Sequence, residues 1–189
     1  MEEDLTAALR GIVHAHYPRG VPADDPAYAR SEESIKLEAA RARAVADDGA
    51  WKRLLEALRA ALPECRVDDW SHLALRRDAS YRCRVELPPF GQSSHALVAC
   101  VSVLAPFYLI YSSRVREADD RPLPPGVRYE LAEGEARHGR VVASNIETVF
   151  GYSAMPPGAG TTVVPDVAVG NERLGEATLL DCLFTDDRW

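Results

Sequence analysis

One apolar stretch constrains the fold more than any other part of the chain. His95 to Ile110 is apolar at nearly every position and rich in β-branched and aromatic side chains, which is typical of a central strand. Pro106 has no backbone N–H to donate to a neighbouring strand, so it marks a bulge, an edge or a tight hairpin. The sequence therefore predicts strand structure that is divided in two at Pro106.

The residues before this stretch change from a helical to a strand period. Residues 3–14 carry apolar side chains at helical spacing, which predicts an amphipathic helix. Ser31 is a suitable N-cap for a longer helical region, which is interrupted at Asp47-Asp48-Gly49 and stopped by Pro63. Tyr81 to Leu87 then alternates between apolar and polar residues. This alternation predicts a half-buried strand.

The second half continues with short elements. Residues 117–126 are a proline-rich loop, and Ser144-Asn145-Ile146-Glu147 is a capping-box pattern that predicts a short helix to about Phe150. We predict strands at Val127–Leu131, Arg140–Ala143 and Thr161–Val169, and at Ala177–Phe184 a strand, with a helix as the alternative. Helices followed by strands favour an α+β fold, with N-terminal helices packed on a mainly antiparallel sheet. We expect a single domain over residues 1–189, with a helical part at 1–62 and a mainly β part at 63–189.

Composition limits the classes of partner. The chain has 47% hydrophobic residues and a formal net charge of −7. Residues 117–189 alone carry 13 acidic and 6 basic side chains, a balance of −7, so this part holds the whole excess. Nucleic acids and anionic membranes are bound by basic surfaces, so neither is an expected partner. A field of one sign steers a partner of the opposite sign, although acidic side chains also serve solubility.

The acidic N-terminus does not resemble a secretion signal, and no apolar run is long enough to cross a membrane. We therefore expect a cytoplasmic protein. In that compartment cysteines stay reduced, so Cys65, Cys83, Cys100 and Cys182 are expected to be free thiols.

Ten of the fourteen aspartates occur in five Asp-Asp pairs, at 24–25, 47–48, 68–69, 119–120 and 186–187. Such pairs can bind a metal, face a partner or cap turns. The closest metal-like group, Asp68-Asp69 with His72 and Asp78, fits no metal motif, so we predict neither a metal nor a cofactor. Most pairs lie at predicted breaks, which favours caps and turns. Asp119, Asp120, Asp186 and Asp187 lie in the acidic part and are the predicted partner-binding residues, together with Trp189, which either packs on the core or anchors a partner.

Three further groups could carry chemistry. His14 and His16 are two residues apart on a predicted helix and so do not share a face. Ser93-Ser94-His95 lies at a strand entry, where a nucleophile is sometimes placed, but the sequence has no G-x-S-x-G motif. Glu147, Asp166 and Asp181 could form an acid/base pair only if the fold brings them together. We predict no catalytic residues.

Two segments near the C-terminus carry a family resemblance. Val163-Val164-Pro165-Asp166-Val167-Ala168-Val169-Gly170-Asn171 and Leu179-Leu180-Asp181-Cys182-Leu183-Phe184-Thr185-Asp186 resemble the closing segment of small, acidic bacterial proteins of toxin–immunity systems. The resemblance implies a compact cytosolic α+β protein without a catalytic motif. We therefore expect a non-catalytic binding protein that neutralises a cognate toxin, such as a basic nuclease, through its acidic surface. The alternative is a small hydrolase or transferase with a dispersed acid/base site.

Overall fold

The computed structural model describes residues 2–75, 78–88, 94–115 and 127–186. At its centre is a sheet with the strand order β1-β2-β3-β4-β5, in which all neighbours are antiparallel. The strands are β1 (Arg66–Asp69), β2 (Ser80–Glu86), β3 (Ser94–Ser102), β4 (Phe107–Val115) and β5 (Val127–Arg128). A sixth, β6 (Ser153–Ala154), pairs parallel with the start of β4. The predicted α+β fold is confirmed.

The sheet is built around the hairpin of β3 and β4. Pro106 lies in the tight turn between them, directly before Phe107 opens β4, and the register places Val101 opposite Tyr108. The predicted division of the apolar stretch at Pro106 is therefore confirmed, and it takes the form of a hairpin. Both strands are buried because helices cover both faces of the sheet.

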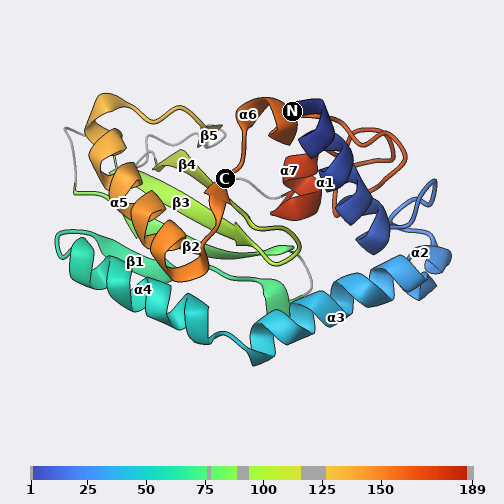
Figure 1. Ribbon diagram of the computed structural model, residues 1–189, viewed down its shortest axis with the longest axis horizontal. Coiled ribbons are helices and arrows are strands. Elements are labelled where there is room, and N and C mark those ends of the chain that lie inside the picture. Colours follow the sequence, from blue (N-terminus) through green and yellow to red (C-terminus); the bar gives the residue numbers. More distant parts are fainter. Residues whose placement is uncertain (1, 76–77, 89–93, 116–126, 187–189) are drawn as a thin grey trace, which may run out of the picture.

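Seven α-helices are described. They are α1 (Glu2–His16), α2 (Pro26–Arg30), α3 (Glu32–Ala46), α4 (Gly49–Ala61), α5 (Glu133–Phe150), α6 (Pro157–Gly160) and α7 (Leu179–Leu183), and a 3-10 turn, η1 (Leu73–Leu75), precedes β2. The N-terminal helices α1 to α4 come before the whole sheet in the chain, as predicted. Helices α1, α3 and α4 contribute buried residues to the core on the two faces of the sheet, and α2 packs against α3. The helices α4 and α5 lie side by side (Figure 1).

Alternation along β3 divides the core into two halves. Leu97, Ala99 and Val101 pack with the apolar faces of α4 and α5. Val98 and Cys100 point to the opposite face and pack with α1 and α7. Successive residues of a strand point to opposite faces, so a run that is apolar at every position is what a sheet between two helical layers requires.

Several predicted elements of the second half are wrong. Arg140–Ala143 is not a strand but the middle of α5, which also contains the whole predicted helix from Ser144 to Phe150. Thr161–Val169 forms isolated bridges at Val163 and Val169 instead of a strand, because its buried valines pack as a loop against α1 and α7. At Ala177–Phe184 the helical alternative holds, since Thr178 caps α7. The strand expected at Val127–Leu131 is limited to the two residues of β5.

No helix in the described part of the chain is both long and apolar enough to cross a membrane. All four cysteines are free, and three of them, Cys83, Cys100 and Cys182, are buried. Burial raises the pKa of the Cys83 and Cys182 thiols, which keeps them protonated at neutral pH.

Candidate functional site

The described Asp pairs mostly serve the local backbone. Asp25 caps α2 by accepting the Ala27 N–H at 2.8 Å. Asp48 takes the N-cap position of α4 without a side-chain cap bond and pairs with Lys52. Asp69 accepts the backbone N–H of Ser71 and, at 3.1 Å, the indole N–H of Trp51. The cap and turn interpretation holds for these pairs, except that 68–69 lies within β1 and not at a break.

Of the five predicted partner-binding residues, only Asp186 is described, while Asp119, Asp120, Asp187 and Trp189 lie outside the described residues. The Asp186 carboxylate accepts the Asn171 N–H at 2.8 Å. It fills the space beside Gly170, whose φ of +54° suits glycine. Asp186 therefore closes the loop at 170–171, and a role toward a partner stays a prediction for all five residues.

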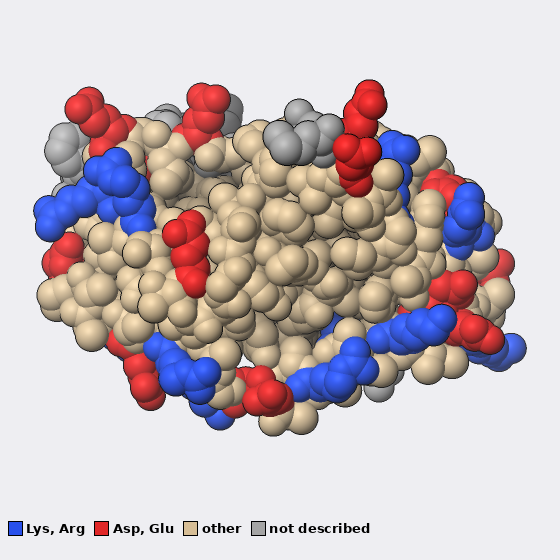
Figure 2. Space-filling view, in the orientation of Figure 1, with Lys and Arg blue, Asp and Glu red and all other residues tan. Residues whose placement is uncertain are grey.

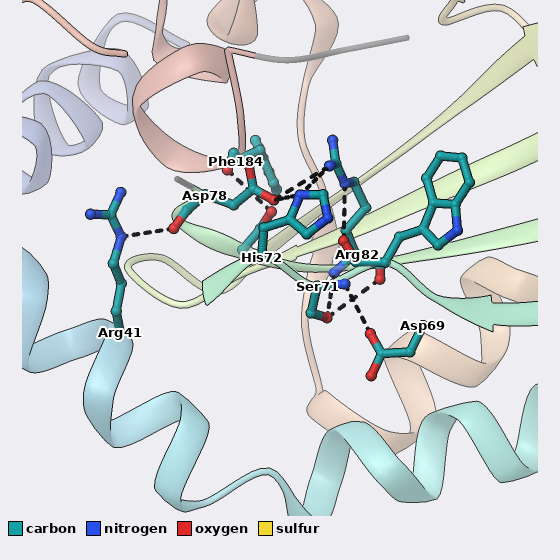
Figure 3. A network of polar contacts seen from close by, with 9 residues as sticks. Arg41, Asp69, Ser71, His72, Asp78, Arg82 and Phe184 are labelled. Atoms are coloured by element: carbon teal, nitrogen blue, oxygen red, sulfur yellow. Dashed lines mark hydrogen bonds and ion pairs between the residues drawn. The ribbon is translucent and has the colours of Figure 1, made fainter. Parts of the chain in front are cut away.

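Of the group noticed in the sequence, His72 and Asp78 come together, with a partner that the sequence did not suggest, whereas Asp68 pairs with Arg66 and Asp69 with Trp51. The Asp78 carboxylate is 1% exposed and lies 3.7 Å from Arg82 Nη2 and 3.8 Å from His72 Nδ1 (Figure 3). Arg82 Nη2 is also 2.9 Å from His72 Nδ1. Because a guanidinium group can only donate, His72 Nδ1 accepts this hydrogen bond and carries no proton. A guanidinium thus supplies the positive charge that a metal would bring to this carboxylate.

This network joins segments that are distant in the chain. The main-chain carbonyl of Asp78 accepts from Arg41 Nε of α3 at 2.8 Å. The carbonyl of Phe184, which follows α7, accepts from the Ala79 N–H and the Ser80 hydroxyl (Figure 3). These bonds dock α3 and the C-terminal segment onto the start of β2, so the network has a structural role.

A second buried carboxylate holds α5 to the sheet. Glu135 is 4% exposed. Its Oε1 lies 3.0 Å from His95 Nδ1 and accepts the Ser112 hydroxyl at 2.7 Å, and its Oε2 accepts the Ala132 N–H at the start of α5. The imidazole next to Ser93 and Ser94 is thus paired with a glutamate of α5, and the side chains of those two serines lie outside the described residues.

The three candidate acid/base carboxylates do not meet. Glu147 accepts the Tyr108 hydroxyl at 2.7 Å, and Asp181 accepts the N–H and hydroxyl of Thr178. Asp166 lies between His14 and Arg19, at 3.0 and 2.5 Å. Desolvation tends to raise the pKa of the Asp166 carboxyl, but the hydrogen bonds with Arg19 and His14 outweigh this effect and hold the pKa below its usual value. Each carboxylate is therefore committed to a different contact within the fold.

A mainly apolar hollow opens beside the β4 edge. It has a volume of about 460 Å³ and lies among β4, β6, α5, α6 and α7. Its 15 lining residues are Tyr108, Leu109, Ile110, Tyr129, Leu131, Ala136, Gly139, Arg140, Ala143, Ala154, Met155, Pro156, Pro157, Thr161 and Leu180, of which 12 belong to the acidic part at 117–189. The face that carries α5 and α6 is largely uncharged across its centre, with charged side chains gathered at its periphery (Figure 2).

This apolar pocket was not predicted, because its walls come from five elements and include alanines, prolines and one glycine that carry no motif. Among the described residues, one set of metal-type ligands also comes within reach of a single ion: Glu64, Cys65 and His138. Comparison with known proteins finds no match to any family model, curated protein or solved structure. The site geometry alone therefore supports what is proposed for the function.

Proposed function

We propose that this chain is a non-catalytic binding protein that neutralises a cognate bacterial toxin, with a basic nuclease as the expected kind of partner. The observation that carries the proposal is the apolar pocket, which opens on a largely uncharged face, has the cation Arg140 in its lining, and draws most of its lining from the most acidic part of the chain. Protein interfaces commonly combine an apolar centre with a polar rim. The pocket is large enough to receive an aromatic or long aliphatic side chain as an anchor.

Charge supports a basic partner. Residues 117–189 carry a balance of −7 and provide most of the pocket lining. Complementary charge around an apolar anchor accelerates encounter and disfavours partners of the wrong sign, while the anchor slows dissociation. An inhibitor of a basic toxin needs both properties.

The polar side chains support binding over catalysis. Glu135, Glu147, Asp166 and Asp181 each accept hydrogen bonds within the fold. A catalytic constellation would bring a base and a nucleophile or acid into one concave site. The lining of the apolar pocket contains no carboxylate and no histidine among the described residues.

The first experiment tests neutralisation directly. Each neighbouring gene product that arrests growth is expressed with and without this chain, and growth and complex formation by calorimetry are measured. We expect one such product to be neutralised and bound at equal stoichiometry. Failure of the chain to relieve growth arrest by any of them would overturn the proposal.

The pocket is tested with a matched pair of helix variants. Ala136→Arg places a long cation in the pocket from α5, whereas Ala60→Arg makes the same change on the exposed surface of α4. We expect Ala136→Arg to weaken toxin binding at least about tenfold, since loss of an anchor contact costs about 2 kcal/mol or more. Ala60→Arg is expected to bind as wild type. Equal binding by both variants would place the interface elsewhere.

The charge contribution is tested without disturbing the 170–171 loop. Asp119→Asn/Asp120→Asn/Asp187→Asn leaves Asp186 and its hydrogen bond intact. The control, Asp24→Asn/Glu32→Gln/Glu56→Gln, removes three exposed charges from residues 1–62. We expect only the first set to slow association and to flatten its dependence on salt. If both sets of variants change the association rate and its salt dependence alike, the acidic part at 117–189 has no special role in steering the partner.

A further inference from the structure

Glu64, Cys65 and His138 come from two segments that the fold places side by side. Glu64 and Cys65 form the turn between α4 and β1, in which the Cys65 N–H bonds to the Leu62 carbonyl at 3.0 Å. His138 lies on α5, which packs beside α4. One potential ligand atom from each of the three residues lies within 4.8 Å of the other two.

We propose that Glu64, Cys65 and His138 form a binding site for Zn²⁺ or a similar borderline-soft divalent cation. His138 Nε2 lies 3.3 Å from Glu64 Oε1. Two ligands at zinc distances of about 2.0–2.1 Å, set at a tetrahedral angle, are separated by about 3.3–3.4 Å. The nitrogen and oxygen therefore already have the spacing that a shared zinc ion requires.

The third ligand needs only a small adjustment. Sulfur binds zinc at about 2.3 Å, so a ligating thiolate lies about 3.5–3.6 Å from the other two donor atoms. The Cys65 sulfur is within 4.8 Å of both. Its side chain is half-buried at the end of a turn, so a rotation about the side-chain bonds can close the difference.

The mixture of ligand types selects the kind of metal. A thiolate with an imidazole favours Zn²⁺, Co²⁺ or Cd²⁺ over Mg²⁺ and Ca²⁺, which prefer oxygen ligands. Three protein ligands leave a fourth position for water or for a group from another molecule. The Glu64 side chain is 43% exposed, so the ion can enter from solvent.

The surroundings of His138 indicate the affinity expected for the metal ion. Its ring nitrogen Nδ1 is buried and has no hydrogen-bond partner among the described residues. Ligating histidines usually donate this second N–H to a neighbour, and loss of that neighbour typically weakens metal binding 10- to 100-fold. We therefore expect weaker affinity than that of a fully supported zinc site.

The site does not depend on the proposed toxin-binding function. On α5, Ala136, Gly139 and Ala143 line the apolar pocket at spacings that share one flank of the helix. His138 is two residues from Ala136 and so projects from the opposite flank. A bound ion would tie α5 to the α4–β1 turn from the side away from the pocket.

The experiment titrates the full-length, metal-free protein with Co²⁺ and then with Zn²⁺. We expect one equivalent of Co²⁺ to bind with a thiolate-to-cobalt charge-transfer band, Zn²⁺ to remove that band, and Zn²⁺ to raise the melting temperature. Cys65→Ser should abolish the band and the thermal shift. Glu64→Gln and His138→Gln should each weaken binding at least about tenfold.

His16→Gln is the matched control, because it removes a histidine that lies on α1, outside the proposed ligand set. It should bind Co²⁺ like the wild type. Cys65 is half-buried, so Cys65→Ser keeps the test valid even if His138→Gln fails to fold. Absence of the charge-transfer band in the wild type, or binding that survives in Cys65→Ser, would overturn the proposal. Neither result would bear on toxin neutralisation.

Discussion

Glu135 provides the sharpest test of how the sheet holds α5. Its carboxylate is buried and contacts three groups: the His95 imidazole, the Ser112 hydroxyl and the Ala132 N–H. Glu135→Ala removes the common partner of all three at once. Ser112 is 0% exposed, so water does not readily replace the lost bond.

The magnitude follows from the groups left behind. An unsatisfied buried donor costs about 1–3 kcal/mol, and this applies to Ser112 and to His95. Loss of a helix cap costs about 0.5–2 kcal/mol, and this applies to the Ala132 N–H. Because His95 is 18% exposed and water can partly replace its lost partner, we expect the lower part of the summed range, a loss of about 3–5 kcal/mol in the free energy of unfolding for Glu135→Ala.

Urea unfolding followed by circular dichroism measures this loss, with Glu133→Ala as the control. Glu133 is exposed in the first turn of the same helix, so its removal should cost less than about 1 kcal/mol. Glu135→Gln keeps an acceptor for the Ala132 N–H and should fall between the two. A loss for Glu135→Ala within 1 kcal/mol of the control, at an unchanged urea slope, would refute the reasoning.

Three other variants test separate parts of the fold. Arg82→Met leaves the Asp78 carboxylate buried without the cation at 3.7 Å, and we expect it to lower the free energy of unfolding in urea by about 3–5 kcal/mol. Adding Asp78→Asn should recover much of this loss. A double variant that is no more stable than Arg82→Met would contradict the pairing. Gly170→Ala strains a φ of +54° and places a methyl group against the Asp186 carboxylate, so the melting temperature should fall by an amount equivalent to about 1–2 kcal/mol of stability. The control Gly20→Ala has a φ of +69° but lies in open space, so its melting temperature should fall less. Burial, and to a smaller extent the nearby Cys182, raises the pKa of the Tyr28 hydroxyl from its ordinary value of 10.0 to about 12. The folded state therefore holds this proton more tightly than the unfolded state. The resulting stabilisation is present below pH 10 and is lost as the pH rises toward 12. Tyr28→Phe removes the hydrogen bond to the Ala168 carbonyl and should lower the free energy of unfolding by about 1 kcal/mol at neutral pH. Between pH 10 and 12 the variant should lose less stability than the wild type.

The sequence predicted the elements whose pattern is set by the sheet itself. The alternation of Tyr81–Leu87 and the apolar run around Pro106 each reflect burial against a neighbouring strand or helix layer, and β2, β3 and β4 follow them closely. Ser31 likewise carries its own cap signal, because its hydroxyl accepts the Ser34 N–H. These signals are local, so no knowledge of distant contacts is needed to interpret them.

Prediction failed where the deciding contact is distant or uses an unexpected residue. The start of α5 has no Ser, Thr, Asn or Asp at its N-cap, and Glu135 makes the capping bond to Ala132 instead, so the helix was placed eleven residues too late at Ser144. The buried valines of 163–169 resemble a strand because they face α1 and α7, not because they pair in a sheet.

The polar networks show the same limit. His72 and Asp78 were grouped from the sequence, but Arg82 was assigned to the polar positions of a half-buried strand. Arg82 is 2% exposed because the segment after α7 covers that face of β2. Only the completed fold, which brings residues 78–82 against residue 184, supplies the information that this arginine neutralises a buried carboxylate.

The position of α5 connects the stability of the chain to its proposed function. One flank of this helix lines the apolar pocket, and its buried face is fixed to β3 and β4 through Glu135. A partner side chain that enters the pocket therefore meets a wall whose position depends on a hydrogen-bond network remote from the surface. Since preorganised sites lose less entropy on binding, Glu135→Ala should weaken toxin binding even at temperatures where the variant remains fully folded. A variant that destabilises the chain at α2, such as Tyr28→Phe, should leave binding by its folded fraction unchanged, because α2 contributes no residue to the lining of the pocket.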